Sequence, residues 1–95
     1  MTTSKLTIDT SADAAYFKIL DGKVSQTKEI DDLLLVDIDQ AGNVLGVEFL
    51  SLELLSEFDP DSISSYLPLL ARNELKHLLQ TPLKDQLNSK QLSLQ

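Results

Sequence analysis

The sequence contains no cysteine and no tryptophan, and it has a single histidine among its 95 residues. Without cysteine there is no disulfide, no thiolate metal site and no thiol nucleophile, which fits a reducing compartment. His77 has no second histidine at zinc-site spacing and no nucleophile motif near it, so we expect it on the surface of a helix. We therefore expect a non-enzymatic protein with no cofactor and no bound metal.

Long apolar runs are missing as well. No stretch approaches the ~18 apolar residues that would span a bilayer. The opening residues MTTSKLTIDT lack the basic and apolar regions of a signal peptide. We expect a cytoplasmic protein with no membrane partner. Aromatic residues make up only 5% of the chain, so leucine must supply most of the core packing.

Basic residues are scarce, and the net charge is −7. Residues 1–61 hold thirteen acids against four bases, whereas residues 62–95 hold two acids against four bases. An acidic region repels phosphate backbones, so we expect no nucleic-acid partner. It would attract a basic protein, mainly by speeding the association.

The length predicts one domain, residues 1–95, and its first half shows the period-two alternation of short strands. Asp21-Gly22 predicts a tight hairpin between the second and third strands. The third strand is polar, which is typical of a sheet edge. The strands are expected at residues 5–9, 14–20, 24–30, 33–38 and 44–50.

The segment from Leu33 to Leu50 predicts a hairpin around a turn at residues 39–43. One face of its two strands is wholly apolar and should form the centre of the core. The opposite face mixes leucines with Asp37 and Glu48, and Gly46 within a strand indicates a bulge or a close approach. The six expected core residues are Leu34, Val36, Ile38, Leu45, Val47 and Phe49.

After residue 50 the apolar spacing becomes helical. Ser51 is a predicted N-cap for a helix reaching Phe58, residues 63–67 predict a short turn, and residues 69–80 predict an amphipathic helix. Thr81-Pro82 predicts a final helix from residue 83 to about 90. The fold class is therefore α+β: an antiparallel β-meander of about five strands in residues 1–50, followed by short C-terminal helices in residues 51–95.

Leucines of this helical half are numerous enough that some should pack between chains. The expected interface residues are Leu70, Leu75, Leu78, Leu79, Leu83 and Leu87.

Four acids are the candidate ligand-binding residues: Asp9, Asp13, Asp37 and Glu48. Carboxylates can bind a hard cation or act as acid and base. The rival interpretation is structural, because Asp at strand ends commonly accepts backbone hydrogen bonds. Glu48, in mid-strand, must be exposed or paired, with Lys18 or the Tyr16 hydroxyl as its partner. No metal-ligand pattern accompanies them.

Three spaced segments of the strand region form a recognisable pattern: Asp9, Ala12, Asp13, Ala14, Tyr16 and Phe17, then Glu29-Ile30, and then Val36, Asp37, Asp39, Gly42, Val44, Gly46, Val47, Glu48 and Leu50. In these segments the chain resembles a family of small bacterial and archaeal proteins, domain of unknown function 2283. The resemblance covers about residues 5–55, and it departs from the family pattern at positions such as Ile8 and Ile38.

The resemblance implies a small sheet-rich domain with no established activity, some of whose members look like the smaller partner of toxin–antitoxin pairs. Together with the residues, it predicts a protein–protein interaction module, antitoxin-like or homodimeric. The alternative is a small-ligand or cation-binding domain that uses the acidic face of the sheet.

Overall fold

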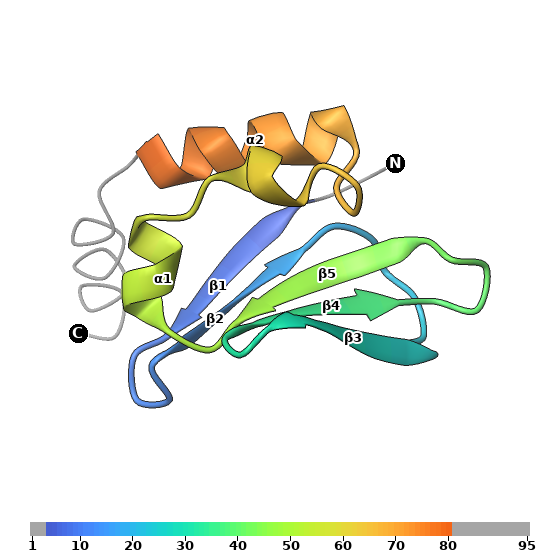
Figure 1. Cartoon of the computed structure of the whole chain (residues 1–95), viewed down its shortest axis with the longest axis horizontal. Coiled ribbons are helices and arrows are strands. Elements are labelled where there is room, and N and C mark those ends of the chain that lie inside the picture. The colour runs from blue at the N-terminus through green and yellow to red at the C-terminus, as the bar shows by residue number, and fades with distance from the viewer. Residues whose placement is uncertain (1–3, 81–95) are drawn as a thin grey trace.

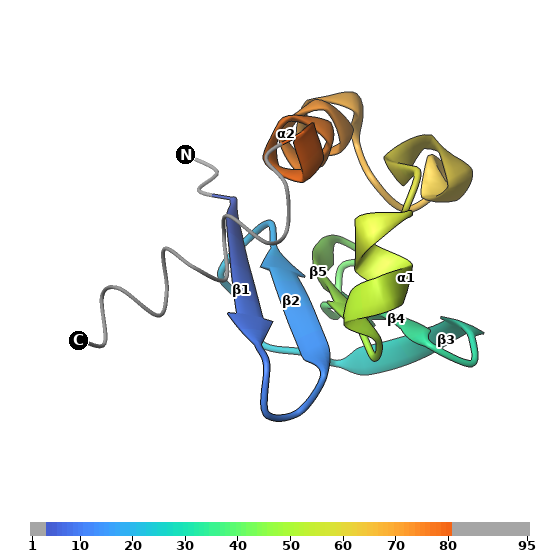
Figure 2. The ribbon, with the colours of Figure 1, turned by 90° about the vertical axis from the view of Figure 1, so that its left-hand side faces the viewer.

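The computed structural model of the chain describes residues 4–80 and consists of a five-stranded antiparallel sheet with helices against one face (Figure 1). The other face of the sheet carries none of the described helices (Figure 2). This architecture confirms the α+β class. The elements are β1 (Lys5–Asp9), β2 (Ala14–Lys18), β3 (Gln26–Asp31), β4 (Leu34–Ile38), β5 (Val44–Phe49), α1 (Leu52–Ser56), the 3-10 helix η1 (Pro60–Ile63) and α2 (Leu69–Gln80).

The strands lie in the order β1-β2-β5-β4-β3. Consecutive hairpins join β3, β4 and β5, and β3 is an edge strand as expected. The predicted Asp21-Gly22 hairpin is wrong, because β2 pairs with β5 instead of β3. Residues 19–25 instead cross the end of the sheet, where Ile19 N donates to Leu45 O at 2.8 Å and Ser25 N to Ile38 O at 2.9 Å.

The β4–β5 hairpin turns where the sequence predicted it. Asp39 Oδ1 accepts hydrogen bonds from Ala41 N at 2.9 Å and Asn43 N at 2.8 Å, and Gly42 takes a φ of 91°. A short Asp side chain and a glycine are the residues that such a turn requires. The cross-strand register then shifts beside Gly46, which leaves Leu45 as an extra residue and confirms the predicted irregularity.

The core lies between the sheet and the helices. Of the six hairpin residues expected there, Leu34, Val36, Val47 and Phe49 are buried in this core, and Ile38 is partly buried against it. Leu45 is buried outside that cluster, because the shift in register beside Gly46 takes it out of the alternation. Phe17 of β2 and Phe49 of β5 are fully buried, and the Phe58 ring meets Phe49 edge-on at 5.0 Å. The helical layer contributes Leu55, Ile63, Leu67, Ala71 and Leu75.

Capping residues set the helix starts. Ser51 caps α1 by accepting from Leu54 N, as predicted, and Asp59 caps η1, where Pro60 occupies the first turn. The 3-10 helix therefore begins before the predicted turn at residues 63–67, whereas α2 spans the predicted residues 69–80. The predicted final helix lies outside the described residues. No helix within residues 4–80 is both long and apolar enough to cross a membrane.

One carboxylate ties η1 to α2. Asp61 accepts from Arg72 Nη1 at 3.1 Å and from Lys76 Nζ at 2.6 Å. The hydrogen bond from Lys76, followed by that from Arg72, lowers the pKa of Asp61 below its usual range. The helical layer is thus held from its outer side by a three-residue ion-pair cluster, Asp61, Arg72 and Lys76.

We expect Asp61→Asn to lower the melting temperature at neutral pH, since it removes both ion pairs. A depressed pKa in the folded state means that this stabilisation is present above the unfolded pKa and is lost as pH falls through the folded pKa. The melting temperatures of variant and parent should therefore converge in acid, as measured by circular dichroism from pH 7 down to pH 2. Asp32→Asn, at an exposed acid with no recorded ion pair in the described region, is the matched control. An equal loss at every pH would contradict the electrostatic origin.

Candidate functional site

The structure does not bring the four predicted ligand-binding acids together in one site. Asp9 accepts from the backbone N–H of Ser11 at 3.1 Å and of Ala12 at 3.2 Å, which closes the β1–β2 turn. Asp13 has a φ of 52° and accepts from Leu52 N at 3.3 Å, so it joins that turn to the start of α1. Both side chains therefore have structural roles in the turn.

Asp37 belongs to a hydrogen-bond network on the uncovered face of the sheet. The Tyr16 hydroxyl donates to Asp37 Oδ2 at 2.9 Å, and the Thr27 hydroxyl donates to Asp37 Oδ1 at 2.6 Å. Three strands, β2, β4 and β3, are linked in this way. Between them lies Gly46 of β5, where a Cβ atom would stand 2.2 Å from the Tyr16 hydroxyl oxygen. The absence of a side chain at Gly46 therefore leaves room for the Tyr16 ring to pass over β5 toward Asp37.

Burial raises the pKa of Tyr16 well above its usual range, and the hydrogen bond to Asp37 and the charges of Asp37 and Glu48 raise it further. A phenol in this state remains protonated at neutral pH and acts as a hydrogen-bond donor. A general base or a nucleophile requires a lowered pKa or a deprotonated group, so the raised pKa of Tyr16 does not suit either role.

Glu48 is the cross-strand neighbour of Tyr16 and is partly buried. The expected partners do not pair with it: Tyr16 donates to Asp37, and Lys18 forms an ion pair with Asp21. Glu48 and Asp9 line one shallow hollow of about 130 Å³ against the Tyr16 ring. Within residues 4–80 no three side chains of the metal-ligating types are grouped to hold an ion.

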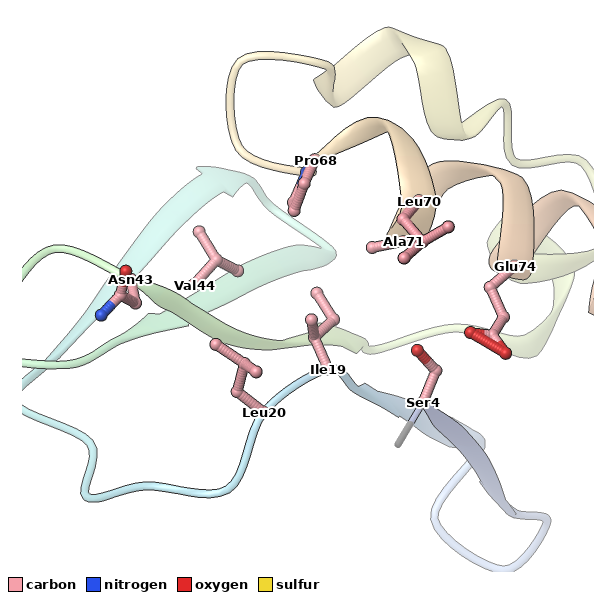
Figure 3. A pocket seen from close by; sticks show the side chains of 9 residues that line it. All are labelled: Ser4, Ile19, Leu20, Asn43, Val44, Pro68, Leu70, Ala71 and Glu74. Carbon is pink, nitrogen blue, oxygen red and sulfur yellow. The ribbon is translucent and has the colours of Figure 1, made fainter. Parts of the chain in front are cut away.

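A larger hollow, of about 280 Å³, lies between the first turns of α2 and the end of the sheet (Figure 3). We call it the α2 hollow. Its walls are mostly apolar, which is typical of sites that take an aliphatic group. The apolar lining residues are Ile19, Leu20, Val44, Pro68, Leu70 and Ala71.

Polar groups stand at the two ends of the α2 hollow. Asn43 lies at one end, and at the other Glu74 of α2 and Ser4 point toward one another (Figure 3). Asn43 Nδ2 already donates to Asp39 Oδ2 at 3.1 Å. Glu74 is exposed, and no ion pair of its carboxylate is recorded in the described region, because Arg72 and Lys76 are held by Asp61. Among residues 4–80, no cation forms an ion pair with the carboxylate at this end of the hollow.

The predicted interface leucines divide into three groups. Leu75 is fully buried in the chain's own core, so it is a core residue and is not available to a partner, and Leu78 and Leu79 are partly buried against that core. Leu70 is 74% exposed at the rim of the α2 hollow. Leu83 and Leu87 lie outside the described residues. His77 is exposed on α2, as expected.

Sequence reasoning missed the α2 hollow and Leu69, which is 61% exposed beside Leu70. The lining comes from four separate segments: Ser4 before β1, residues 19–20 after β2, residues 43–44 at the start of β5, and residues 68–74 at the start of α2. The adjacent pair Leu69-Leu70 was a usable signal, because neighbouring positions on a helix point in different directions, so at least one of the two is expected away from the centre of the core.

The sequence was also compared with known proteins. The family model described as "Protein of unknown function (DUF2283)" matches residues 5–52, which span the five strands and the first residue of α1. The match confirms the resemblance noted from the sequence. No curated protein and no solved structure matches the chain.

We expect Gly46→Ala to destabilise the fold by about 1–3 kcal/mol, the usual cost of overpacking, because its methyl group collides with Tyr16. In a Tyr16→Ala background the same substitution should cost much less, since the collision is gone. Urea unfolding of the four proteins in this double-mutant cycle measures the difference. Equal costs in both backgrounds would show that the tyrosine is not the obstacle.

The Tyr16 hydroxyl should ionise only at strongly alkaline pH. We expect the Tyr16 phenolate to form well above the usual pKa of about 10, and its signal to be absent in Tyr16→Phe. Because the folded pKa is raised, the stabilisation is complete below the unfolded pKa and is lost as pH rises toward the folded value. An ultraviolet titration of phenolate absorbance measures both proteins, and the difference between the two curves is the Tyr16 signal. A difference signal centred near the usual pKa of about 10 would refute the partial burial of the Tyr16 hydroxyl.

Proposed function

The chain belongs to the DUF2283 family, and we propose that it is a non-enzymatic cytoplasmic protein that acts by contact with other proteins. One observation carries the proposal: Leu69 and Leu70 are 61% and 74% exposed on the first turn of α2, beside the apolar α2 hollow. Large apolar side chains grouped at a concave surface are typical of protein interaction sites.

A homodimer is the first association that we propose. Covering each leucine contributes about 2 kcal/mol, the usual value for a side chain of this size. A symmetric dimer covers Leu69 and Leu70 of both copies, so the four side chains together contribute about 8 kcal/mol. This sum lies within the ~4–15 kcal/mol that association costs in lost freedom and leaves little surplus. A dimer held by these leucines is therefore weak and leaves the surface available to a better partner.

The better partner that we propose is a basic protein that this acidic chain binds and restrains, as an antitoxin does. The strands and first helices carry thirteen acids against four bases over residues 1–61. Such a field accelerates the approach of a basic partner and opposes the approach of a second acidic copy. The charge distribution thus favours the hetero-association over the homodimer.

The alternative of a small-ligand or cation site on the acidic face gains no support from the described residues. Asp13 and Asp37 are committed to separate hydrogen bonds, to Leu52 N and to the Tyr16 and Thr27 hydroxyls. Only Asp9 and Glu48 share a hollow. Our proposal therefore rests on the α2 surface.

We expect sedimentation to show a reversible dimer with a dissociation constant in the micromolar range or weaker. Leu70→Glu should abolish it, because the substitution places a charge at the centre of the contact. Leu33→Glu is the matched control, since Leu33 is a 42% exposed leucine in the β3–β4 connection. A parent that stays monomeric at all concentrations would refute the homodimer, and a dimer lost equally in both variants would refute the α2 surface as its contact.

A further inference from the structure

The α2 hollow combines apolar walls with a single carboxylate at one end (Figure 3). Ile19 and Val44 form the sheet side of the hollow, and Ala71 forms part of the helix side. Glu74 and Ser4 close one end with oxygen atoms. This order of groups, aliphatic contact followed by a negative charge, is complementary to a side chain with an aliphatic stem and a cationic head.

We propose that the α2 hollow receives a lysine side chain of the protein partner, with its stem along Ile19 and Val44 and its ammonium group at Glu74. The inference rests on the proposed function and names the chemistry of the partner at that surface. A lysine stem packs readily along apolar surface while its ammonium group stays near water or a counter-ion. An ammonium is also a compact point charge, which one carboxylate can balance without the two-pronged geometry that arginine prefers.

The volume supports a side chain as the occupant. A hollow of about 280 Å³ is far larger than the ~30 Å³ share of one molecule in liquid water, so it can admit a single extended side chain such as that of lysine. Leu70 at the rim would then contact the partner's main chain on either side of the lysine.

The charges around α2 favour Glu74 as the anchoring group. The two cations of the helix, Arg72 and Lys76, are engaged by Asp61 on the side that packs against η1. Glu74 lies among the residues of the hollow instead. A cation supplied from outside therefore does not have to displace an existing ion pair in the described region. The net charge of −7 adds a long-range attraction for a basic segment.

The test uses the full chain, labelled with ¹⁵N, and three capped peptides: acetyl-Ala-Leu-Lys-Leu-Ala-amide, the same peptide with norleucine in place of lysine, and the same peptide with glutamate there. Norleucine keeps the aliphatic stem and removes the charge. We expect the lysine peptide to shift the backbone amide signals of Val44, Ala71 and Glu74, and to bind more tightly than the other two.

Two variants test the contribution of the Glu74 carboxylate by itself. Glu74→Gln should weaken the binding of the lysine peptide by about threefold, as is usual for a partly exposed ion pair, and should leave the affinity for the norleucine peptide unchanged. Glu53→Gln, at an exposed acid of α1 outside the hollow, should change neither. Equal affinities for the lysine and norleucine peptides, or no effect of Glu74→Gln, would overturn the proposal.

Two further outcomes would also overturn it. Signal changes confined to residues outside the hollow would place the peptide elsewhere, and tighter binding of free n-hexylamine than of the lysine peptide would indicate a small-molecule site. Neither outcome depends on self-association through Leu70, which sedimentation measures separately. Failure of the lysine proposal is therefore distinguishable from failure of the interaction surface.

Discussion

The pairing of β2 with β5 is the contact on which the rest of the structure depends. It joins the β1–β2 hairpin to the β3–β4–β5 unit, and it brings Phe17 opposite Val47 and Ala15 opposite Phe49 in the centre of the core. Without it each unit would be a two- or three-stranded sheet with an open edge, and small isolated sheets are marginal in water. The same pairing places the end of β2 beside the start of β5, which forms the sheet side of the α2 hollow.

The two faces of the sheet are stabilised by different interactions. On the helical side, apolar packing dominates, and no polar or charged residue of the described region is buried. On the open side, the strands are tied together laterally by the Tyr16, Asp37 and Thr27 hydrogen bonds. Asp37 holds neighbouring strands together through these hydrogen bonds. This structural role explains an acid in the middle of a central strand without a catalytic or ligand-binding role. Most aspartates within residues 4–80 are structural acceptors, and the two most exposed large apolar side chains of that region, Leu69 and Leu70, lie on α2.

Much of the architecture could be predicted because it is encoded locally. Alternation located the five strands, Ser51 fixed the start of α1, and the apolar spacing defined α2 over its full length. The error at Asp21-Gly22 has a physical reason: a turn signal describes local backbone preference, whereas the choice of strand partner depends on packing across the whole sheet. Gly46 was correctly marked as special, but the ring that crosses it comes from Tyr16, and the sequence held no sign of that contact. For the same reason the α2 hollow, assembled from four segments, could not be predicted.

The assembly of the α2 hollow from distant segments also couples occupancy to folding. Its walls from β2, β5 and α2 come together only when the β2–β5 pairing and the helical layer are both in place. An unfolded or partly folded chain has no such hollow, so any occupant binds the native state alone and stabilises it by mass action. The stability of this small domain is then not a fixed property of its sequence. It varies with the supply of whatever fills the space beneath α2.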